Sequence, residues 1–123
     1  MTLPLRRTRV LSVWLAWLAA APVAFAHAVL VRSSPGDHSV VHTDSLDIVL
    51  QYNSRIDAAR STVSLTDAGG KQVFLQLQRS ANPGELEASV HNLKNGDYRV
   101  HWQVLASDGH ITRGEVNFSV MLP

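Results

Sequence analysis

Residues 98–104 read YRVHWQV, a run in which every second side chain is apolar. On an extended backbone Tyr98, Val100, Trp102 and Val104 share one face, and the polar residues between them point to the other. A period of two is typical of a strand with one buried and one solvated face. We therefore expect a strand here, with Trp102 as a central core residue and Tyr98 as either a corner tyrosine or a plain core residue.

Similar short runs occur on both sides of this segment, at 28–31, 46–52, 62–66, 73–78, 86–90 and 116–120. Turn-forming residues rich in glycine, proline, asparagine and aspartate separate them, at 34–37, 67–70, 82–84 and 95–97. About seven short strands without a convincing helix predict an all-β fold of two antiparallel sheets packed face to face. The expected architecture is a Greek-key sandwich or barrel, immunoglobulin-like or cupredoxin-like.

The first 26 residues have the pattern of a signal peptide. Three arginines precede the apolar stretch 10–21, and Ala24-Phe25-Ala26 offers small residues where a signal peptidase cuts. We predict cleavage before His27, a mature domain of residues 27–123 and a periplasmic location. The alternative is a retained membrane anchor, since a spanning helix needs roughly 20 apolar residues, but Pro22 disfavours it. The pair Arg6-Arg7 leaves Sec and twin-arginine export both open.

Composition limits what the mature domain can be. Of the 123 residues 97 would remain, which is enough for a single domain. Removing three arginines from the 11 basic residues leaves 8 against 10 acidic residues, so nucleic acid is not an expected partner. The chain has no cysteine, which excludes both disulfides and thiolate ligands. A monomer is expected.

His27 would become the first residue of the mature chain. Its free α-amine and its imidazole Nδ1 could then close a six-membered chelate on one metal ion, and nitrogen donors in a near-planar set suit Cu(II). The segment Ser107-Asp108-Gly109-His110 directly follows the strand at 98–104. Asp108 and His110 would project to one side on an extended backbone, and so could add a carboxylate and a second imidazole. Read alone, the same segment also fits a turn with an exposed His110.

Together these segments resemble the CopC family of periplasmic copper-binding proteins. The matching stretches cover the mature chain: HAVL at 27–30, SPGD at 34–37, LQYN at 50–53, GDYRVHW at 96–102, SDGHITRG at 107–114 and FSV at 118–120. The resemblance implies a seven-stranded sandwich that binds one Cu(II) ion through His27, Asp108 and His110. It also implies a CopD-type inner-membrane copper transporter as a partner.

Two departures from the family pattern affect the expected site. Residues 52–55 read YNSR where members often have Phe-Ser-Glu-Pro, so an acidic group near the metal is missing. Met121 is the only methionine after the signal segment, which argues against a methionine-rich Cu(I) site. Of the other histidines, His101 is expected on the solvated strand face, and His91 on the surface. We expect a loop at 38–42, with His38 as a weaker candidate for a position near the metal.

The predicted function is Cu(II) buffering or carriage for copper homeostasis or resistance, without catalysis. One alternative is a copper-dependent oxidase or monooxygenase, because an N-terminal histidine with a second histidine also occurs in such enzymes. Asp108 in a fourth equatorial position would leave little open coordination for oxygen. The other alternative is a metal-free immunoglobulin-like interaction module, which a copper titration would distinguish.

Overall fold

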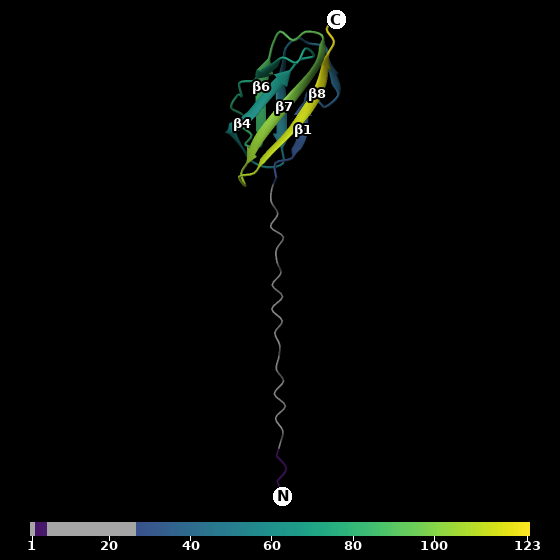
Figure 1. Ribbon diagram of the computed structural model, residues 1–123. Helices are drawn as coiled ribbons and strands as arrows, with labels where there is room; N and C mark the ends of the chain where they lie inside the picture. The colour runs from purple at the N-terminus through teal and green to yellow at the C-terminus, as the bar shows by residue number, and fades with distance from the viewer. Residues whose placement is uncertain (1, 5–26) are drawn as a thin grey trace.

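The computed structural model describes residues 2–4 and 27–123, and this part of the chain is built of strands without a helix (Figure 1). The strands are β1 (Leu30–Ser34), β2 (Ser39–Val41), β3 (Leu46–Tyr52), β4 (Ile56–Thr66), β5 (Gln72–Phe74), β6 (Glu85–Val90), β7 (Gly96–Ala106) and β8 (Ile111–Val120). Most of the predicted signal segment, residues 1 and 5–26, lies outside the described residues. Among the residues described, no helix is long and apolar enough to span a membrane.

Two sheets form the fold, as the strand pattern predicted. The smaller has the order β1-β3-β6, and the larger has the order β2-β8-β7-β4-β5. The described residues contain eight strands rather than about seven, and the added one is β2. It pairs in parallel with β8, so the prediction of purely antiparallel sheets was wrong at this edge. A strand of three residues is too short to show a period of two, and for the same reason the loop predicted at 38–42 was wrong.

The chain crosses between the two sheets on both sides of the molecule. On one side it leaves the smaller sheet after β1 and joins the larger sheet at β2. On the other side, Leu75 N donates to Val63 O at 2.8 Å, and three residues later Gln78 N donates to Glu87 O at 2.8 Å. These crossings cover the sheet edges and give the sandwich a barrel-like closure.

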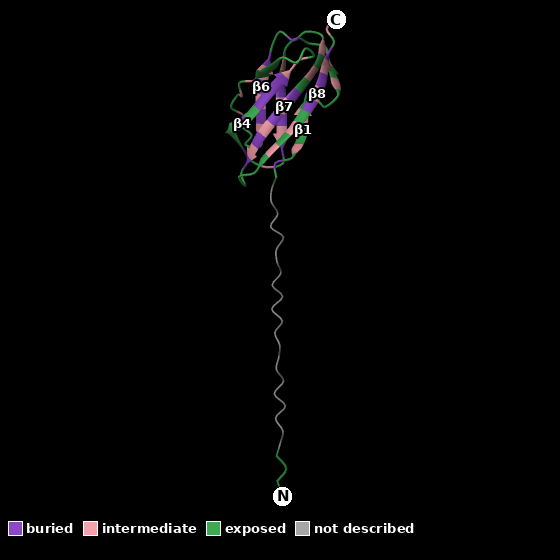
Figure 2. Cartoon of the chain, viewed as in Figure 1, coloured by how far each residue is buried: buried purple, intermediate pink, exposed green. Residues whose placement is uncertain are grey.

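The core lies between the inner faces of the two sheets, where buried positions alternate along the strands (Figure 2). In β7 the buried residues are Val100, Trp102, Val104 and Ala106, and the residues between them are only partly buried. Trp102 packs edge-to-face on Tyr52 with ring centroids 5.2 Å apart. The predicted core role of Trp102 is confirmed.

Tyr98 forms a tyrosine corner at the start of β7. Its hydroxyl donates to Lys94 O and accepts from Lys94 N, both at 2.9 Å. Its ring stacks on Phe118 of β8 with centroids 5.4 Å apart. A tyrosine that bonds the backbone a few residues upstream is a hallmark of Greek-key sandwiches, so the first of the two readings of Tyr98 is correct.

Gly114 faces the indole of Trp102 across the β7–β8 ladder. A Cβ placed on Gly114 would lie 2.7 Å from Trp102 Cε2, closer than such atoms approach in proteins. We expect Gly114→Ala to lower the free energy of unfolding by about 1–3 kcal/mol, because the indole must shift within a packed core. Urea unfolding measures the change. Gly36→Ala is the matched control, since nothing lies within 4 Å of a Cβ there; equal losses in both variants would contradict the packing argument.

Candidate metal centre

The β7–β8 connection holds Asp108 and His110 in a tight loop. Ala106 N donates to His110 O at 2.9 Å, and Gly109 N donates to Ala106 O at 3.0 Å. Gly109 has a φ of 83°, in the left-handed region that glycine adopts without strain. Asp108 Oδ1 accepts a 2.9 Å hydrogen bond from His110 N. The loop therefore places the carboxylate and the second imidazole next to each other.

His27 reaches the same place from the other end of the sequence. It lies just before β1, and the segment that contains it enters the sandwich at the end where the β7–β8 connection lies (Figure 1). The next residue, Ala28, is buried in the core. Asn53 N then donates to Val29 O at 3.0 Å, which attaches the segment to the end of β3. His27 is thereby brought from 81 positions away to the side of Asp108.

The three predicted ligand side chains converge. His27, Asp108 and His110 each offer a donor atom, and these atoms all lie within 4.8 Å of one another. The rings of His27 and His110 meet edge-to-face with centroids 5.1 Å apart. His110 Nδ1 lies 3.0 Å from Asp108 Oδ2. All three residues are exposed, so a metal ion could reach them from solvent.

The carboxyl of Asp108 is held in its ionised form. Its pKa is lowered, first by the hydrogen bond from the backbone N–H of His110 and then by the His110 side chain. Desolvation opposes this shift, and the nearby charge of His27 adds a smaller lowering effect. An ionised carboxylate beside two imidazoles is the protonation state that a divalent cation needs.

The donor set consists of nitrogen and oxygen only. In the full chain the backbone nitrogen of His27 belongs to a peptide bond with Ala26, so an amine would join the set only after cleavage there. Two imidazoles, one carboxylate and one amine would then form an N,N,N,O set, which is suited to tetragonal Cu(II). Among the described residues, this cluster contains one carboxylate, that of Asp108.

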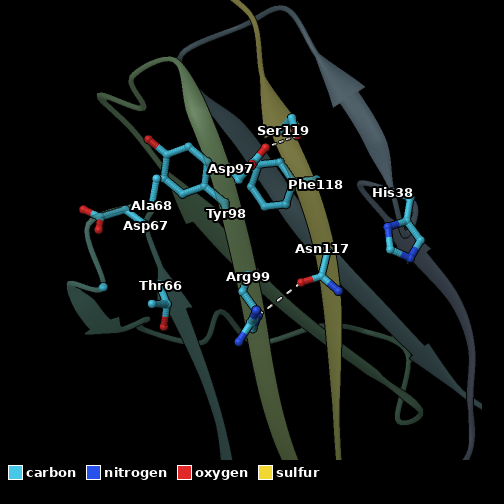
Figure 3. Close-up of a pocket in the computed structure, with 11 residues that line it drawn as sticks. His38, Thr66, Asp67, Ala68, Asp97, Tyr98, Arg99, Asn117, Phe118 and Ser119 are labelled. Carbon is cyan, nitrogen blue, oxygen red and sulfur yellow. Dashed lines mark hydrogen bonds between the residues drawn. The ribbon is translucent and has the colours of Figure 1, made fainter.

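The other histidines lie elsewhere. His38 is not part of the cluster: it pairs with Asp37 at 3.4 Å and donates from its backbone N to Asn117 O. Figure 3 shows it beside β8, at the rim of a surface hollow that is also lined by Arg99 and Asn117. His101 lies on the outer face, as predicted, with Nδ1 3.2 Å from Glu115 Oε1. None of the residues lining that hollow belongs to the metal-ligand cluster.

Two more histidines complete the set. His42 follows β2 and its Nδ1 lies 2.8 Å from Met121 O. His91 is exposed after β6, as expected. Asn53 and Thr112 were not predicted to contribute to the site, but their side chains contact the backbone beside His27. A single Asn or Thr in a strand pattern carries no signal of such a contact.

The fold and the cluster together describe a small two-sheet β-sandwich with three exposed potential metal ligands, His27, Asp108 and His110, beside its first strand. Residues 30–121 match the model of the CopC domain family. The chain belongs to the CopC family.

Several known proteins are similar to this chain along most of its length. Copper resistance protein C of Xanthomonas campestris pv. juglandis is 31% identical over 105 residues, which are 79% of this chain and 82% of that protein. The crystal structure of CopC from Methylosinus trichosporium OB3b is 33% identical, with a TM-score of 0.73 over 78% of this chain and 95% of that one. Copper transport protein CutJ of Bacillus subtilis is 25% identical over 100 residues, and this chain spans only 18% of its length.

Proposed function

We propose that this protein binds one Cu(II) ion in the periplasm, after cleavage before His27. The ligands are the α-amine and imidazole of His27, the carboxylate of Asp108 and the imidazole of His110. The observation that carries the proposal is the convergence of these side chains, with donor atoms within 4.8 Å of one another. Membership of a family that includes a protein named copper resistance protein C supports copper as the metal.

The proposed role is copper buffering and carriage in copper homeostasis or resistance. An exposed site on a preformed sandwich suits a protein that takes up and releases its cargo without refolding. The match to one part of the much longer copper transport protein CutJ supports a link to copper transport. We propose a CopD-type inner-membrane transporter as the recipient of the ion.

A catalytic role is a weaker candidate. The loop holds Asp108 against His110 by hydrogen bonds, and the carboxylate of Asp108 would add a fourth donor to the amine and the two imidazoles. A copper ion held by four protein donors offers little open coordination for oxygen, whereas enzymes that activate small molecules at a metal keep a position open. A metal-free interaction module would leave the convergence of three metal-ligating side chains without a role.

The decisive experiment combines two measurements on exported protein. Mass spectrometry of the purified periplasmic protein gives its first residue, which we expect to be His27. A Cu(II) titration of the same sample, followed by its d–d absorption, gives the stoichiometry, which we expect to be one. A different first residue, or no absorption band on titration, would reject the proposed site.

Copper is expected to raise the melting temperature of the mature protein, because a ligand that binds only the folded state stabilises that state. At a free concentration 100 times the Kd the gain is about 2.7 kcal/mol. The apo protein should nevertheless remain folded, since its core of buried side chains between two sheets contains no metal ligand. Differential scanning calorimetry with and without Cu(II) measures the shift, and His27→Ala is the control. An apo form without dispersed amide NMR signals would contradict this expectation.

A further inference from the structure

The peptide group between Ala28 and Val29 is held on both of its polar atoms by side chains. Thr112 Oγ1 donates to Ala28 O at 3.1 Å. Val29 N donates to Asn53 Oδ1 at 2.8 Å. Asn53 also donates from its backbone N to Val29 O at 3.0 Å. Three hydrogen bonds thus hold the backbone within two residues of His27.

The two side chains come from different sheets. Asn53 directly follows β3 in the smaller sheet, and Thr112 is the second residue of β8 in the larger sheet. Thr112 also lies two positions after His110, which directly precedes β8, so one proposed ligand lies close in sequence to a residue that contacts the segment of the other. Between these contacts the Ala28 side chain is buried in the core. We call Asn53 and Thr112, with their bonds to the 28–29 peptide, the N-terminal clamp.

The clamp acts where a chain end would otherwise be loosely ordered. The first residues of a domain fray unless their backbone is held in place, and fixing a residue costs conformational entropy. After cleavage His27 would be such a terminal residue, with only the bond to Ala28 on one side. A site whose ligands are already ordered before the ion arrives loses less conformational entropy when it binds the ion, so its affinity is higher. The clamp is therefore expected to raise copper affinity, in addition to ordering the backbone before β1.

We propose that Asn53 and Thr112 are positioning residues that hold the mature N-terminus over the Asp108 and His110 ligands. This inference rests on the proposed copper site and adds to it the part of the protein that preorganises it. Outer partners that orient metal ligands typically change metal affinity 10–100-fold when they are removed. We expect a loss of roughly this size from each half of the clamp.

The affinity test uses the mature protein and a competition titration of Cu(II) against a chromophoric chelator. Thr112→Val removes the hydroxyl at nearly constant volume, whereas Thr112→Ser keeps it. We expect Thr112→Val and Asn53→Ala to weaken Cu(II) binding by roughly 10–100-fold. Thr112→Ser should keep most of the wild-type affinity. Asn95→Ala is the matched control, because Asn95 Oδ1 accepts a similar backbone bond from Leu122 N at 2.6 Å, in the C-terminal segment. It should lower stability without changing copper affinity.

A second measurement needs no copper. In the apo protein we expect Thr112→Val and Asn53→Ala to speed hydrogen exchange at the Val29 amide and to weaken the NMR contact between the His27 and His110 rings. The proposal would be overturned if hydrogen exchange and the ring contact were unchanged in both variants. It would also be overturned if the two variants lost no more Cu(II) affinity than Asn95→Ala does. If the wild-type protein failed to bind Cu(II) while the clamp variants released the Val29 amide, the copper site would be rejected and the clamp retained.

Discussion

Placing one glycine before His27 in the mature protein is expected to weaken Cu(II) binding by several orders of magnitude. The extension leaves every side chain unchanged, but it turns the α-amine of His27 into a peptide nitrogen and moves the free amine out of chelate position. The side-chain donors of His27, Asp108 and His110 remain together in the extended protein. The loss of Cu(II) affinity therefore measures the contribution of the amine alone. A competition titration measures the affinity, and electron paramagnetic resonance reports the ligand set.

Three substitutions provide affinities with which the glycine-extended protein can be compared. His27→Ala should lose a comparable amount of affinity, because it removes the imidazole half of the same chelate. His38→Ala and His101→Ala should change affinity little, since these residues pair with Asp37 and Glu115 and are not part of the cluster. An unchanged affinity and an unchanged spectrum in the glycine-extended protein would show that the amine is not a ligand.

Copper affinity is also expected to fall steeply as the pH drops below about 6. Each nitrogen donor must lose its proton before it binds the metal. Reference pKa values are about 7.7–8.0 for an α-amine and about 6.5 for an imidazole. Below these values one proton competes with the metal ion for each of the three nitrogen donors. Affinity therefore falls by up to roughly 1000-fold per pH unit. The lowered pKa of Asp108 keeps its carboxylate ionised across this range, so it adds nothing to the slope.

Two variants separate the contributions to this pH profile. His110→Ala removes one nitrogen donor and should lower the slope of log affinity against pH from about three to about two. Asp108→Asn should weaken binding at every pH but leave the slope unchanged, because its carboxyl does not titrate there. Competition titrations below about pH 6, where the steep fall is expected, measure both slopes. A slope that fell in Asp108→Asn would show that the carboxylate takes up a proton in this range.

The strands were predictable where apolar alternation is long enough to be counted. The runs at 46–52 and 98–104 both coincide with strands, and Trp102 is in the core as its position in the pattern predicted. Alternation is a local property, because one buried face demands an apolar residue at every second position. The three residues of β2 cannot show it, and their parallel pairing with β8 depends on a segment almost 80 positions away.

The candidate site residues could be named from the sequence for a different reason. Asp108 and His110 lie two positions apart in one loop, and His27 follows a signal-peptidase motif. The clamp was not predictable, because Asn53 and Thr112 contact a peptide group rather than a side chain of a particular kind. Any residue sequence at 28–29 would present the same backbone atoms.

The sequence by itself determined that this protein is a small β-sandwich, that strands run through 46–52 and 98–104, and which three residues to consider as metal ligands. These are properties of residue type and short spacing, which local physical chemistry governs. Only the tertiary structure decided that His27 meets Asp108 and His110, that β2 closes one edge, and that two sheets together hold the peptide beside His27. Those contacts join positions more than 20 residues apart, and they exist because burial of the shared core brings the sheets together.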